Sequence, residues 1–233
     1  MRRNGAPLFM FYTKIIKELR KKTDEVILFH SATGKDSICL CDLLSKNFNK
    51  VVCVFMYIVK GLDYENRYIN YALKKYRNIE FIQVPHYALN SFIKHGYLGI
   101  KKDVNIEANK ISKIDKLIRK KYKIDYSVYG FKKNDGITRR LMLNQLKEGI
   151  SHNTKKAYPL MDLKNENVLM YISDNNLIPP FNYSKTKPSS GCDISQPEYL
   201  SYIKNKYPED LRKIYNQFPL CEAILFRYEN KTE

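Results

Sequence analysis

The sequence predicts an α/β protein: a parallel twisted sheet with helices on both faces, followed by a helical C-terminal extension. Three observations support this fold class. Short apolar segments recur through the first half of the chain, as expected of strands buried on both faces of a sheet. Between them lie segments with apolar residues at helical spacing, which is the alternation typical of parallel α/β proteins. After residue 184, prolines punctuate helical patterns.

The first half of the chain alternates regularly between helix and strand. An amphipathic helix over 8–21 precedes the first strand, and apolar residues after that strand again recur at helical spacing. This order predicts parallel strands joined by right-handed crossovers. The expected strands lie at 26–29, 51–58, 79–84 and 126–129, with further helices at 63–76 and 106–122.

The second half is less regular and contains a cationic segment. Residues 90–105 indicate a loop with a short helix, and 131–140 form a polar, basic stretch just past the fourth strand. Open α/β sheets bind ligands at the carboxyl ends of their strands, so we expect this stretch near a ligand.

The C-terminal part is predicted to be helical. A helix is expected over 166–175 with Asn165 as its N-cap, and two more begin near Pro197 and Pro208. We see no linker or repeat. The predicted organisation is therefore one domain, with an α/β part over 1–183 that is extended by helices over 184–233.

The chain is strongly basic. Lys and Arg outnumber Asp and Glu by 41 to 24, for a formal net charge of +17. Such a protein attracts nucleic acid, nucleotides and other anions, so nucleic acid is a candidate partner. Two alternatives stay open. AT-rich genomes also encode lysine-rich chains, and the basic helix at 106–122 can simply be a solvated face opposite an apolar stripe.

The cysteine pattern and the hydropathy indicate the compartment. None of the five cysteines has the partner spacing of a zinc site or a disulfide framework, so we expect reduced thiols in the cytoplasm. No apolar run approaches a membrane span and no signal peptide precedes the first helix, so no membrane partner is expected. A protein partner or a homo-oligomer stays open.

The candidate site is the stretch 26–37, a buried strand followed by a polar turn and the first turn of a helix. A helix N-terminus favours phosphate through its free backbone N–H groups and the positive end of its dipole. Lys35 can add a positive charge and Asp36 can be a Mg²⁺ ligand. His30, which ends the strand, is either a ligand contact or structural.

These residues and two later segments resemble a known family. Thr-Gly-Lys-Asp-Ser at 33–37 looks like the loop of the PP-loop ATP pyrophosphatases, and within them it is most similar to the phosphoadenosine phosphosulfate (PAPS) reductase family. The pattern Gly130-x-Lys132-x-x-Asp135-x-x-x-Arg139 keeps the spacing of that family's second motif, and 158–183 resembles its Pro-Leu-x-Asp segment. The resemblance covers about residues 24–195 and implies an adenine nucleotide alpha hydrolase-like, Rossmann-like fold.

The resemblance implies a reaction and assigns residues to it. ATP with Mg²⁺ is the expected cofactor set, and a small anion in sulfur metabolism is the expected substrate. ATP would be cleaved between its α- and β-phosphates, so that pyrophosphate leaves and the substrate is adenylylated. The implied catalytic residues are Lys35, Asp36, Lys132 and Arg139, with Asp36 also the metal ligand. The implied nucleotide contacts are Ser31, Thr33, Gly34, Lys35, Ser37 and Asp162.

Departures from the family pattern keep other functions open. Ala32 and Thr33 replace the usual Ser and Gly of the loop, and Lys132 replaces an Arg, which keeps the charge but loses the bidentate fork. The alternatives are a PAPS reductase proper, an enzyme that thiolates DNA or tRNA, and a phage-encoded binding or structural protein that has lost turnover.

The C-terminal cysteines differ from the family pattern as well. Cys192 falls at the first Cys of a Gly-Cys-x-x-Cys motif and is either a sulfur carrier or inert, whereas Ser195 replaces the second. Since only Cys192 and Cys221 remain in this part of the chain, we expect no iron–sulfur cluster.

Overall fold

The fold is built around a sheet in the order β3-β2-β1-β4-β6-β5. It is seen in a computed structural model that describes residues 14–181 and 193–230. All neighbouring strands are parallel except β5 and β6, which are antiparallel. The strands are β1 (Glu25–His30), β2 (Lys50–Tyr57), β3 (Ile79–Pro85), β4 (Ser127–Val128), β5 (Ile150–Ser151) and β6 (Lys156–Ala157).

β1 and β2 lie inside the sheet because their side chains are apolar on both faces. Val26, Ile27 and Leu28 of β1 are each 0% exposed. The register runs from Glu25 opposite Lys50 to His30 opposite Phe55. β1 and β2 therefore run side by side to nearly the same level, and the loops that follow them begin at one edge of the sheet.

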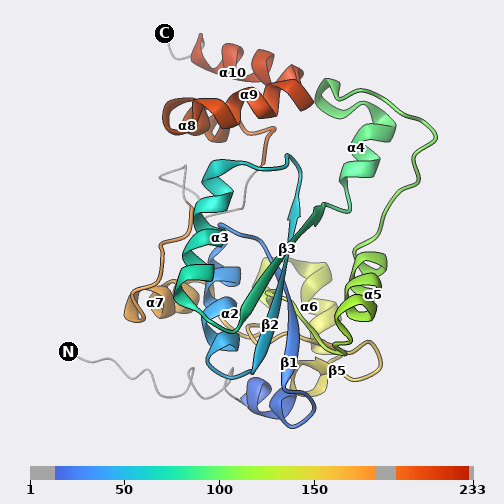
Figure 1. Ribbon diagram of the computed structural model, residues 1–233, viewed down its shortest axis with the longest axis vertical. Helices are drawn as coiled ribbons and strands as arrows, with labels where there is room; N and C mark the ends of the chain where they lie inside the picture. Colours follow the sequence, from blue (N-terminus) through green and yellow to red (C-terminus); the bar gives the residue numbers. More distant parts are fainter. Residues whose placement is uncertain (1–13, 182–192, 231–233) are drawn as a thin grey trace.

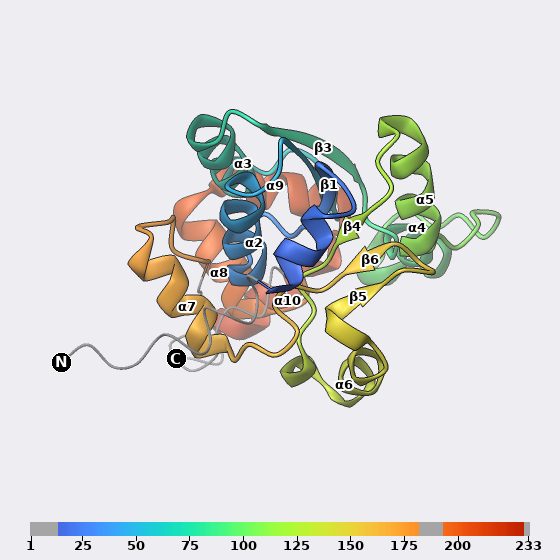
Figure 2. The same cartoon turned by 90° about the horizontal axis from the view of Figure 1, so that it is seen from below.

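Helices connect the strands and cover both faces of the sheet. The α-helices are α2 (Lys35–Ser45), α3 (Asp63–Lys75), α4 (Leu89–His95), α5 (Ile111–Tyr122), α6 (Ile137–Asn144), α7 (Asn165–Asp174), α8 (Pro197–Lys206), α9 (Pro208–Gln217) and α10 (Leu220–Glu229). Short 3₁₀ turns form η1 (Tyr97–Gly99), η2 (Lys133–Asp135) and η3 (Lys147–Gly149). A further helical segment covers 14–20. Figures 1 and 2 show α2, α3 and α7 on one face of the sheet and α5 on the other.

The C-terminal helices α8, α9 and α10 lie beyond the ends toward which the strands point (Figure 1). Asp210 of α9, which is 0% exposed, ties them to the rest. Its carboxylate accepts hydrogen bonds from the amides of Asp63 and Tyr64 at 2.9 and 3.0 Å, at the start of α3. Lys213 donates to Asp210 at 2.9 Å. A carboxylate is stabilised at a helix N-terminus, so this contact holds the helices over the carboxyl edge of the sheet.

The predicted fold class is confirmed, including the parallel sheet and the C-terminal helices. α8 and α9 begin at Pro197 and Pro208, where the missing backbone donor of proline is not needed by the helix. Within the described residues, no helix combines the length and apolarity that a membrane crossing requires.

Two helices begin at residues other than those predicted. The helix expected over 106–122 begins at Ile111, and the side chain of Asn109 accepts a hydrogen bond from the Lys110 amide at 2.8 Å. Such local bonds compete with helix formation. In α7, Asn165 is the first helical residue and not the N-cap, which is Lys164.

The segment 131–140 contains η2 and the start of α6, for which no helix was predicted. Among the residues of α6, Leu143 is 0% exposed, whereas Ile137 and Leu141 are 76% and 62% exposed. Apolar periodicity cannot reveal a helix whose apolar side chains face solvent. The antiparallel pair β5–β6 was also not predicted, because two-residue strands have no recognisable pattern.

Some predictions fall outside the described residues. These are the start of the first helix at 8–13, the domain boundary at 183/184, and the position of Cys192. The division into 1–183 and 184–233 therefore stays a prediction.

Candidate functional site

The loop between β1 and α2 is closed by short internal hydrogen bonds. The Ser31 amide donates to Ser37 Oγ at 2.8 Å, and the Gly34 amide donates to the Ser31 carbonyl at 2.7 Å. Gly34 is the N-cap of α2, and a Cβ there would lie 3.3 Å from the Ser31 carbonyl oxygen. The loop thus presents the N-terminus of an eleven-residue helix, a site that favours phosphate, at the carboxyl edge of the sheet.

The two positions at which this loop departs from the family pattern are buried. Ala32 and Thr33 are 1% and 3% exposed. The Thr33 carbonyl accepts a hydrogen bond from the Phe181 amide at 3.1 Å, which joins the loop to the chain that follows α7. Both side chains therefore fit the packed loop, and the loop keeps a closed conformation with them.

A cavity of about 600 Å³ opens beside this loop at the carboxyl ends of the strands. Ser31, Ala32 and Thr33 form one part of its wall, and Arg139 approaches from α6. Most of the remaining wall is apolar or aromatic, which is typical of small-molecule sites. Members of that wall include Phe29, Phe55, Met56, Val59, Leu62, Phe92, Tyr97, Tyr129, Phe131, Ile194 and Tyr199.

A cluster of alternating charges lies behind the loop and joins α2 to η2 and α6. Lys132 is 0% exposed, and its ammonium contacts Asp36 at 2.7 Å and Asp135 at 3.1 Å. Lys35 contacts Asp36 at 3.2 Å, and Arg139 contacts Asp135 at 2.8 Å. The sequence motifs at 33–37 and 130–139 therefore meet in space, as the resemblance implies.

The carboxylate of Asp135 is stabilised in its charged form. Burial alone would raise its pKa, but the Lys132 amide, the Lys132 ammonium and Arg139 outweigh burial and lower the pKa below the ordinary value. Gly130, which lines the cavity, lies so close to Asp36 that a larger residue would not fit easily. A Cβ at position 130 would lie 3.1 Å from the Asp36 Cβ. Small size at 130 thus lets the two motifs pack together.

Not every predicted residue lies where the resemblance implies. Arg139 lines the cavity, with its guanidinium 4.2 Å from the centroid of the Phe131 ring. Asp162 does not line the cavity and pairs with Lys133 at 2.6 Å. Lys35 and Lys132 are buried behind the loop wall. Because the Lys132 ammonium contacts two carboxylates, we interpret Lys132 as a residue that positions and neutralises them, and not as one that contacts a substrate.

The geometry around Asp36 allows one metal contact. Asp36 Oδ1 is buried and has no hydrogen-bond partner among the described residues, while Oδ2 pairs with the two lysines. Mg²⁺ is commonly held by one or two carboxylates together with substrate phosphates, so this single oxygen fits such a site. Within 14–181 and 193–230, no group of three or more His, Cys, Asp or Glu is placed to hold a metal by itself.

Two polar residues of the cavity were missed or left open by sequence reasoning. Glu65, in the first turn of α3, lines the cavity, and its position shortly after the second strand was the signal that could have found it. His30 is 4% exposed, lines the cavity, and has its ring edge-on to Phe81 at 5.1 Å. His30 Nδ1 has no hydrogen-bond partner among the described residues.

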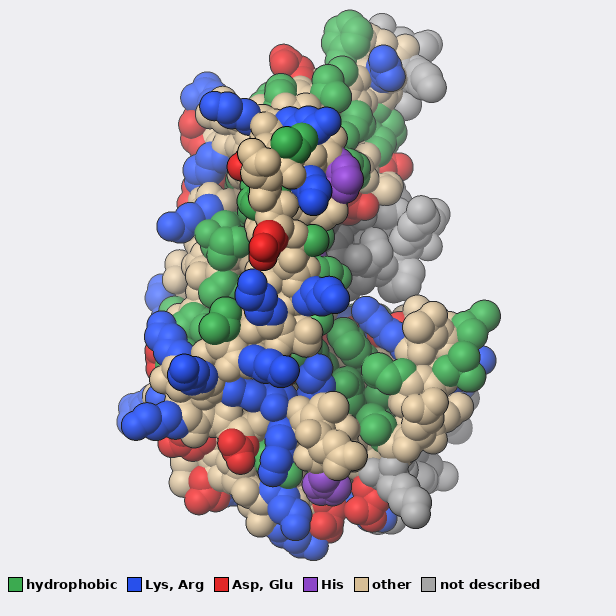
Figure 3. Space-filling view, turned by 90° about the vertical axis from the view of Figure 1, so that its right-hand side faces the viewer, with side chains coloured by type: hydrophobic (Ala, Val, Ile, Leu, Met, Phe, Trp, Pro, Cys, Tyr) green, Lys and Arg blue, Asp and Glu red, His purple; other side chains and the backbone are tan. Residues whose placement is uncertain are grey.

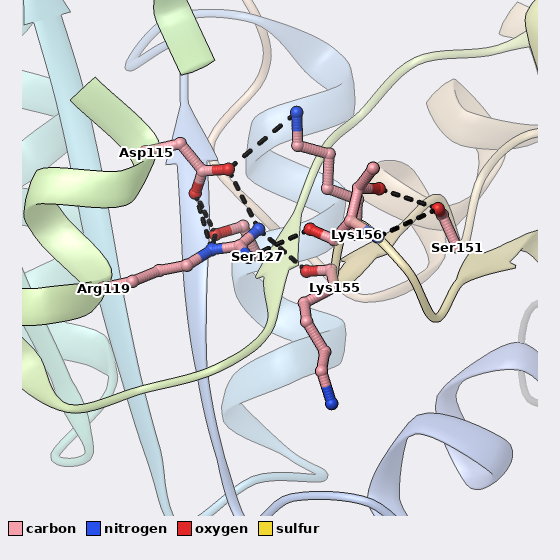
Figure 4. A network of polar contacts seen from close by, with 7 residues as sticks. Asp115, Arg119, Ser127, Ser151, Lys155 and Lys156 are labelled. Carbon is pink, nitrogen blue, oxygen red and sulfur yellow. Dashed lines mark hydrogen bonds and ion pairs between the residues drawn. The ribbon is translucent and has the colours of Figure 1, made fainter. Parts of the chain in front are cut away.

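A buried polar network fixes the strand that leads to the second motif (Figure 4). Arg119 of α5 donates to both carboxylate oxygens of Asp115 at 3.0 and 2.9 Å, and Ser127 of β4 donates to Asp115 at 2.5 Å. Arg119 also donates to the carbonyls of Thr154 and Lys155, each at 2.9 Å. The basic helix therefore has a structural function on its inner face, where it holds β4 and β6 together.

The sequence and the fold are both similar to those of known proteins. The sequence profile of the phosphoadenosine phosphosulfate reductase domain matches residues 26–195. The fold is similar to the U34-tRNA thiolase NcsA from Methanococcus maripaludis with its [4Fe-4S] cluster, at 18% identity and a TM-score of 0.49, over 96% of this chain and 78% of that chain.

Two further solved structures are similar at lower identity. The phosphoadenylyl-sulfate (PAPS) reductase from Candida auris, a phosphate complex, has 12% identity and a TM-score of 0.45 over 77% of this chain and 90% of that chain. The NH3-dependent NAD synthetase from Campylobacter jejuni, a nitrate complex, has 12% identity and a TM-score of 0.49 over 97% and 96%. No curated protein matches this chain in sequence.

The exclusion of an iron–sulfur cluster is corrected by these comparisons. The thiolase to which this chain is similar carries a [4Fe-4S] cluster, so the expectation of no cluster does not stand. It relied on counting cysteines in the C-terminal part, but thiolate ligands can come from any segment that the fold brings together. The count was therefore not a valid criterion.

Proposed function

The chain belongs to the phosphoadenosine phosphosulfate reductase domain family, and from this premise we propose that it binds ATP and cleaves it between the α- and β-phosphates. The observation that carries the proposal is the closed loop at 31–37, which opens an α-helix N-terminus beside a cavity of about 600 Å³. The intact Gly34-Lys35-Asp36-Ser37 sequence supports a triphosphate as the ligand.

In the proposed reaction an oxygen of an anionic acceptor attacks the α-phosphorus. The new bond joins that oxygen to the adenylyl group, and the bond to the β-phosphate oxygen breaks, so that pyrophosphate leaves with the electron pair. The chain contributes positioning and charge neutralisation and forms no covalent bond. An acceptor from sulfur metabolism, such as sulfate, is the substrate class that the family favours.

We assign the residues by their contacts. The backbone amides of Lys35, Asp36 and Ser37 in the first turn of α2, with the Ser31 hydroxyl, would bind the phosphates. Thr33 and Gly34 would form the turn that presents these amides, and the Lys35 ammonium would neutralise charge that develops on the phosphates. Lys132 would act as a positioning residue, because both carboxylates of the cluster contact its ammonium.

The remaining assignments concern the metal and the acceptor. Asp36 Oδ1 would contact a phosphate-bound divalent cation. Arg139, at the cavity wall, would bind the anionic acceptor. Asp162 stays a proposed site residue that acts through its partner Lys133. The described cysteines Cys39, Cys41, Cys53 and Cys221 are free thiols, which supports our placement of the chain in the reducing cytoplasm.

The test is pyrophosphate release from ATP in the presence of Mg²⁺, measured across a panel of small anions. We expect pyrophosphate release with at least one acceptor. In Lys35→Ala the rate of release should fall by at least about 100-fold, since electrostatic stabilisation of this kind contributes that much to the rate. Lys74→Ala removes the same charge at an exposed position of α3 and should leave release unchanged.

The outcomes separate the alternatives. Release that Lys35→Ala does not change would contradict the site. ATP binding without pyrophosphate release for every acceptor would favour a protein that has lost turnover, and preference for a 3′-phosphate sulfo-nucleotide would favour a PAPS reductase.

One observation supports a second candidate, an enzyme that modifies nucleic acid. Figure 3 shows a band of Lys and Arg side chains on the face of the molecule that carries α5. The outward side of α5 and the residues beside it contain the exposed Lys110, Lys113, Lys116, Lys120, Lys121 and Lys123. A band of positive charge can follow a phosphate backbone, and the affinity it provides depends steeply on salt.

The test of this second candidate is the salt dependence of tRNA and DNA binding. For a real phosphate-contacting face, the combined Lys113→Ala, Lys116→Ala and Lys120→Ala variant should reduce the slope of log K against log salt by about one per lysine. An unchanged slope would identify these lysines as a solvated helix face. A protein partner or homo-oligomer stays a prediction.

A further inference from the structure

One carboxyl group of the cavity wall, that of Glu65, forms no ion pair with a described residue. Glu65 lines the cavity from the first turn of α3. Its Oε2 is buried without a hydrogen-bond partner among the described residues, and Oε1 lies 3.5 Å from the Tyr64 hydroxyl, at the limit of a hydrogen bond. Buried polar atoms are nearly always paired in folded proteins, so an unpaired atom on a residue of the cavity wall indicates an absent partner.

The groups packed around Glu65 favour its uncharged form. Asp210 of α9 is the acid whose charge acts on Glu65, and Asp210 itself is paired with Lys213 and with the α3 amides. Burial, and then the Asp210 charge, raise the pKa of Glu65 to about 8. The other titratable groups of the cavity wall are His30, His86, Arg139, Asp193, Tyr87, Tyr97, Tyr129 and Tyr199.

A carboxylic acid in this position can donate one hydrogen bond and accept others. The wall near it includes Val59 and Leu62 on the segment that precedes α3, together with Ile194 and Tyr199 from the C-terminal part. An apolar wall with one neutral polar group selects a ligand that offers a hydrogen-bond acceptor and fills the remaining volume.

We propose that Glu65 binds the nucleotide directly, as an acid that donates a hydrogen bond to an acceptor atom of the bound adenine nucleotide. This inference rests on the proposed function, because that function supplies the nucleotide. The acceptor is a phosphate oxygen or a ring nitrogen of the base; both accept the same hydrogen bond. Nucleotide binding is then coupled to the proton on Glu65, and loss of that proton weakens binding.

The experiment measures the dissociation constant of ATP between pH 6.5 and 9.5 by calorimetry for the wild type, Glu65→Gln, Glu65→Ala and the exposed control Glu107→Ala. Above pH 8 the wild-type affinity should fall by up to about tenfold per pH unit. Glu65→Gln donates at every pH and should lose this dependence. Because all variants bind the same ligand, titration of ATP itself cancels in the comparison.

Glu65→Ala removes the donor and should bind ATP about tenfold more weakly than the wild type at pH 7, with Glu107→Ala unchanged. Inorganic tripolyphosphate and adenosine then identify the acceptor. If tripolyphosphate loses affinity in Glu65→Ala, the acceptor is a phosphate oxygen; if adenosine does, it lies on the nucleoside.

Two negative results are distinguishable. In the first, the wild type binds ATP, Glu65→Ala binds it equally well, and Glu65→Gln shows the same pH dependence as the wild type. This result overturns the role of Glu65 and leaves the proposed function standing. A wild type that binds no ATP at any pH overturns the proposed function, and the role of Glu65 with it. Circular dichroism on Glu65→Ala separates loss of the donor from loss of the fold.

Discussion

The two sides of the cavity differ in how they balance buried charge. Next to the loop at 31–37, Lys35, Lys132 and Arg139 contact Asp36 and Asp135 at 2.7–3.2 Å. At the start of α3, Glu65 has no such partner, and one of its oxygens is buried without a hydrogen bond among the described residues. On the first side each carboxylate contacts two cations, whereas Glu65 contacts no cation among the described residues.

This difference separates two kinds of residue that a sequence motif does not distinguish. Charges that are satisfied by each other hold a site in shape, and their loss destabilises the protein. A polar group that is left unsatisfied in a cavity is available for binding, and its loss changes affinity with a smaller effect on the fold. The three comparisons that follow test this separation.

The largest expected effect is the loss of the buried ammonium. Lys132→Met leaves Asp36 and Asp135 without the cation that joins them and should lower the free energy of unfolding by about 3–5 kcal/mol. Lys133→Met is the matched control, because Lys133 is part-exposed and pairs with Asp162 alone; it should cost less than about 1 kcal/mol. Urea denaturation measures both, and equal losses would contradict the structural role of Lys132.

The next effect is a pH dependence of opposite sign at the two sides. The native pKa of Glu65 is raised from 4.5 to about 8, so the native state holds a proton that the unfolded state has lost in this window. The contribution of Glu65 to stability therefore falls as pH rises from 4.5 to 8. The pKa of Asp135 is lowered below 3.8, so its stabilisation is present above that value and is lost as pH falls through the native pKa.

Variants separate these two contributions. Glu65→Gln should gain stability over the wild type progressively as pH rises to about 8, whereas Asp135→Asn should be less stable at neutral pH and approach the wild type in acid. Thermal unfolding at a series of pH values measures both. If the two variants shift stability with the same sign of pH dependence, the contrast between the two sides is wrong.

The smallest effect concerns the exposed end of the charge cluster. Arg139 lies over the Phe131 ring at 4.2 Å and is exposed, so Arg139→Ala should cost about 0.5–1 kcal/mol of stability. Arg140→Ala, next in the chain and exposed, should cost less. The assay that matters is the acceptor concentration needed for half-maximal pyrophosphate release, which should rise for Arg139→Ala alone.

The sequence predicted the sheet well where burial is continuous. β1 and β2 are apolar on both faces, which leaves a clear pattern, and the prolines at 197 and 208 placed two helix starts. It failed for α6, whose apolar side chains Ile137 and Leu141 face solvent, and for the two-residue strands β5 and β6. Pattern methods detect burial, so an element that buries little leaves no signal.

The site was predicted to a similar degree. The loop and Arg139 line one cavity, because both follow the carboxyl ends of neighbouring strands, and their roles in binding stay predictions. Motif spacing could not show that Lys132 is buried between two carboxylates, or that Asp162 pairs with Lys133 outside the cavity wall. Glu65 belongs to no motif, and its environment includes Asp210, which lies far away in sequence.

The central claim is that the helix N-terminus at the loop binds the triphosphate of ATP. A crystal structure with a non-hydrolysable ATP analogue tests it most directly. The account predicts the β- and γ-phosphates against the backbone amides of 35–37, with the rest of the nucleotide in the cavity that Glu65 lines. Phosphates bound elsewhere, or a loop that accepts only a 3′-phosphate sulfo-nucleotide, would contradict it.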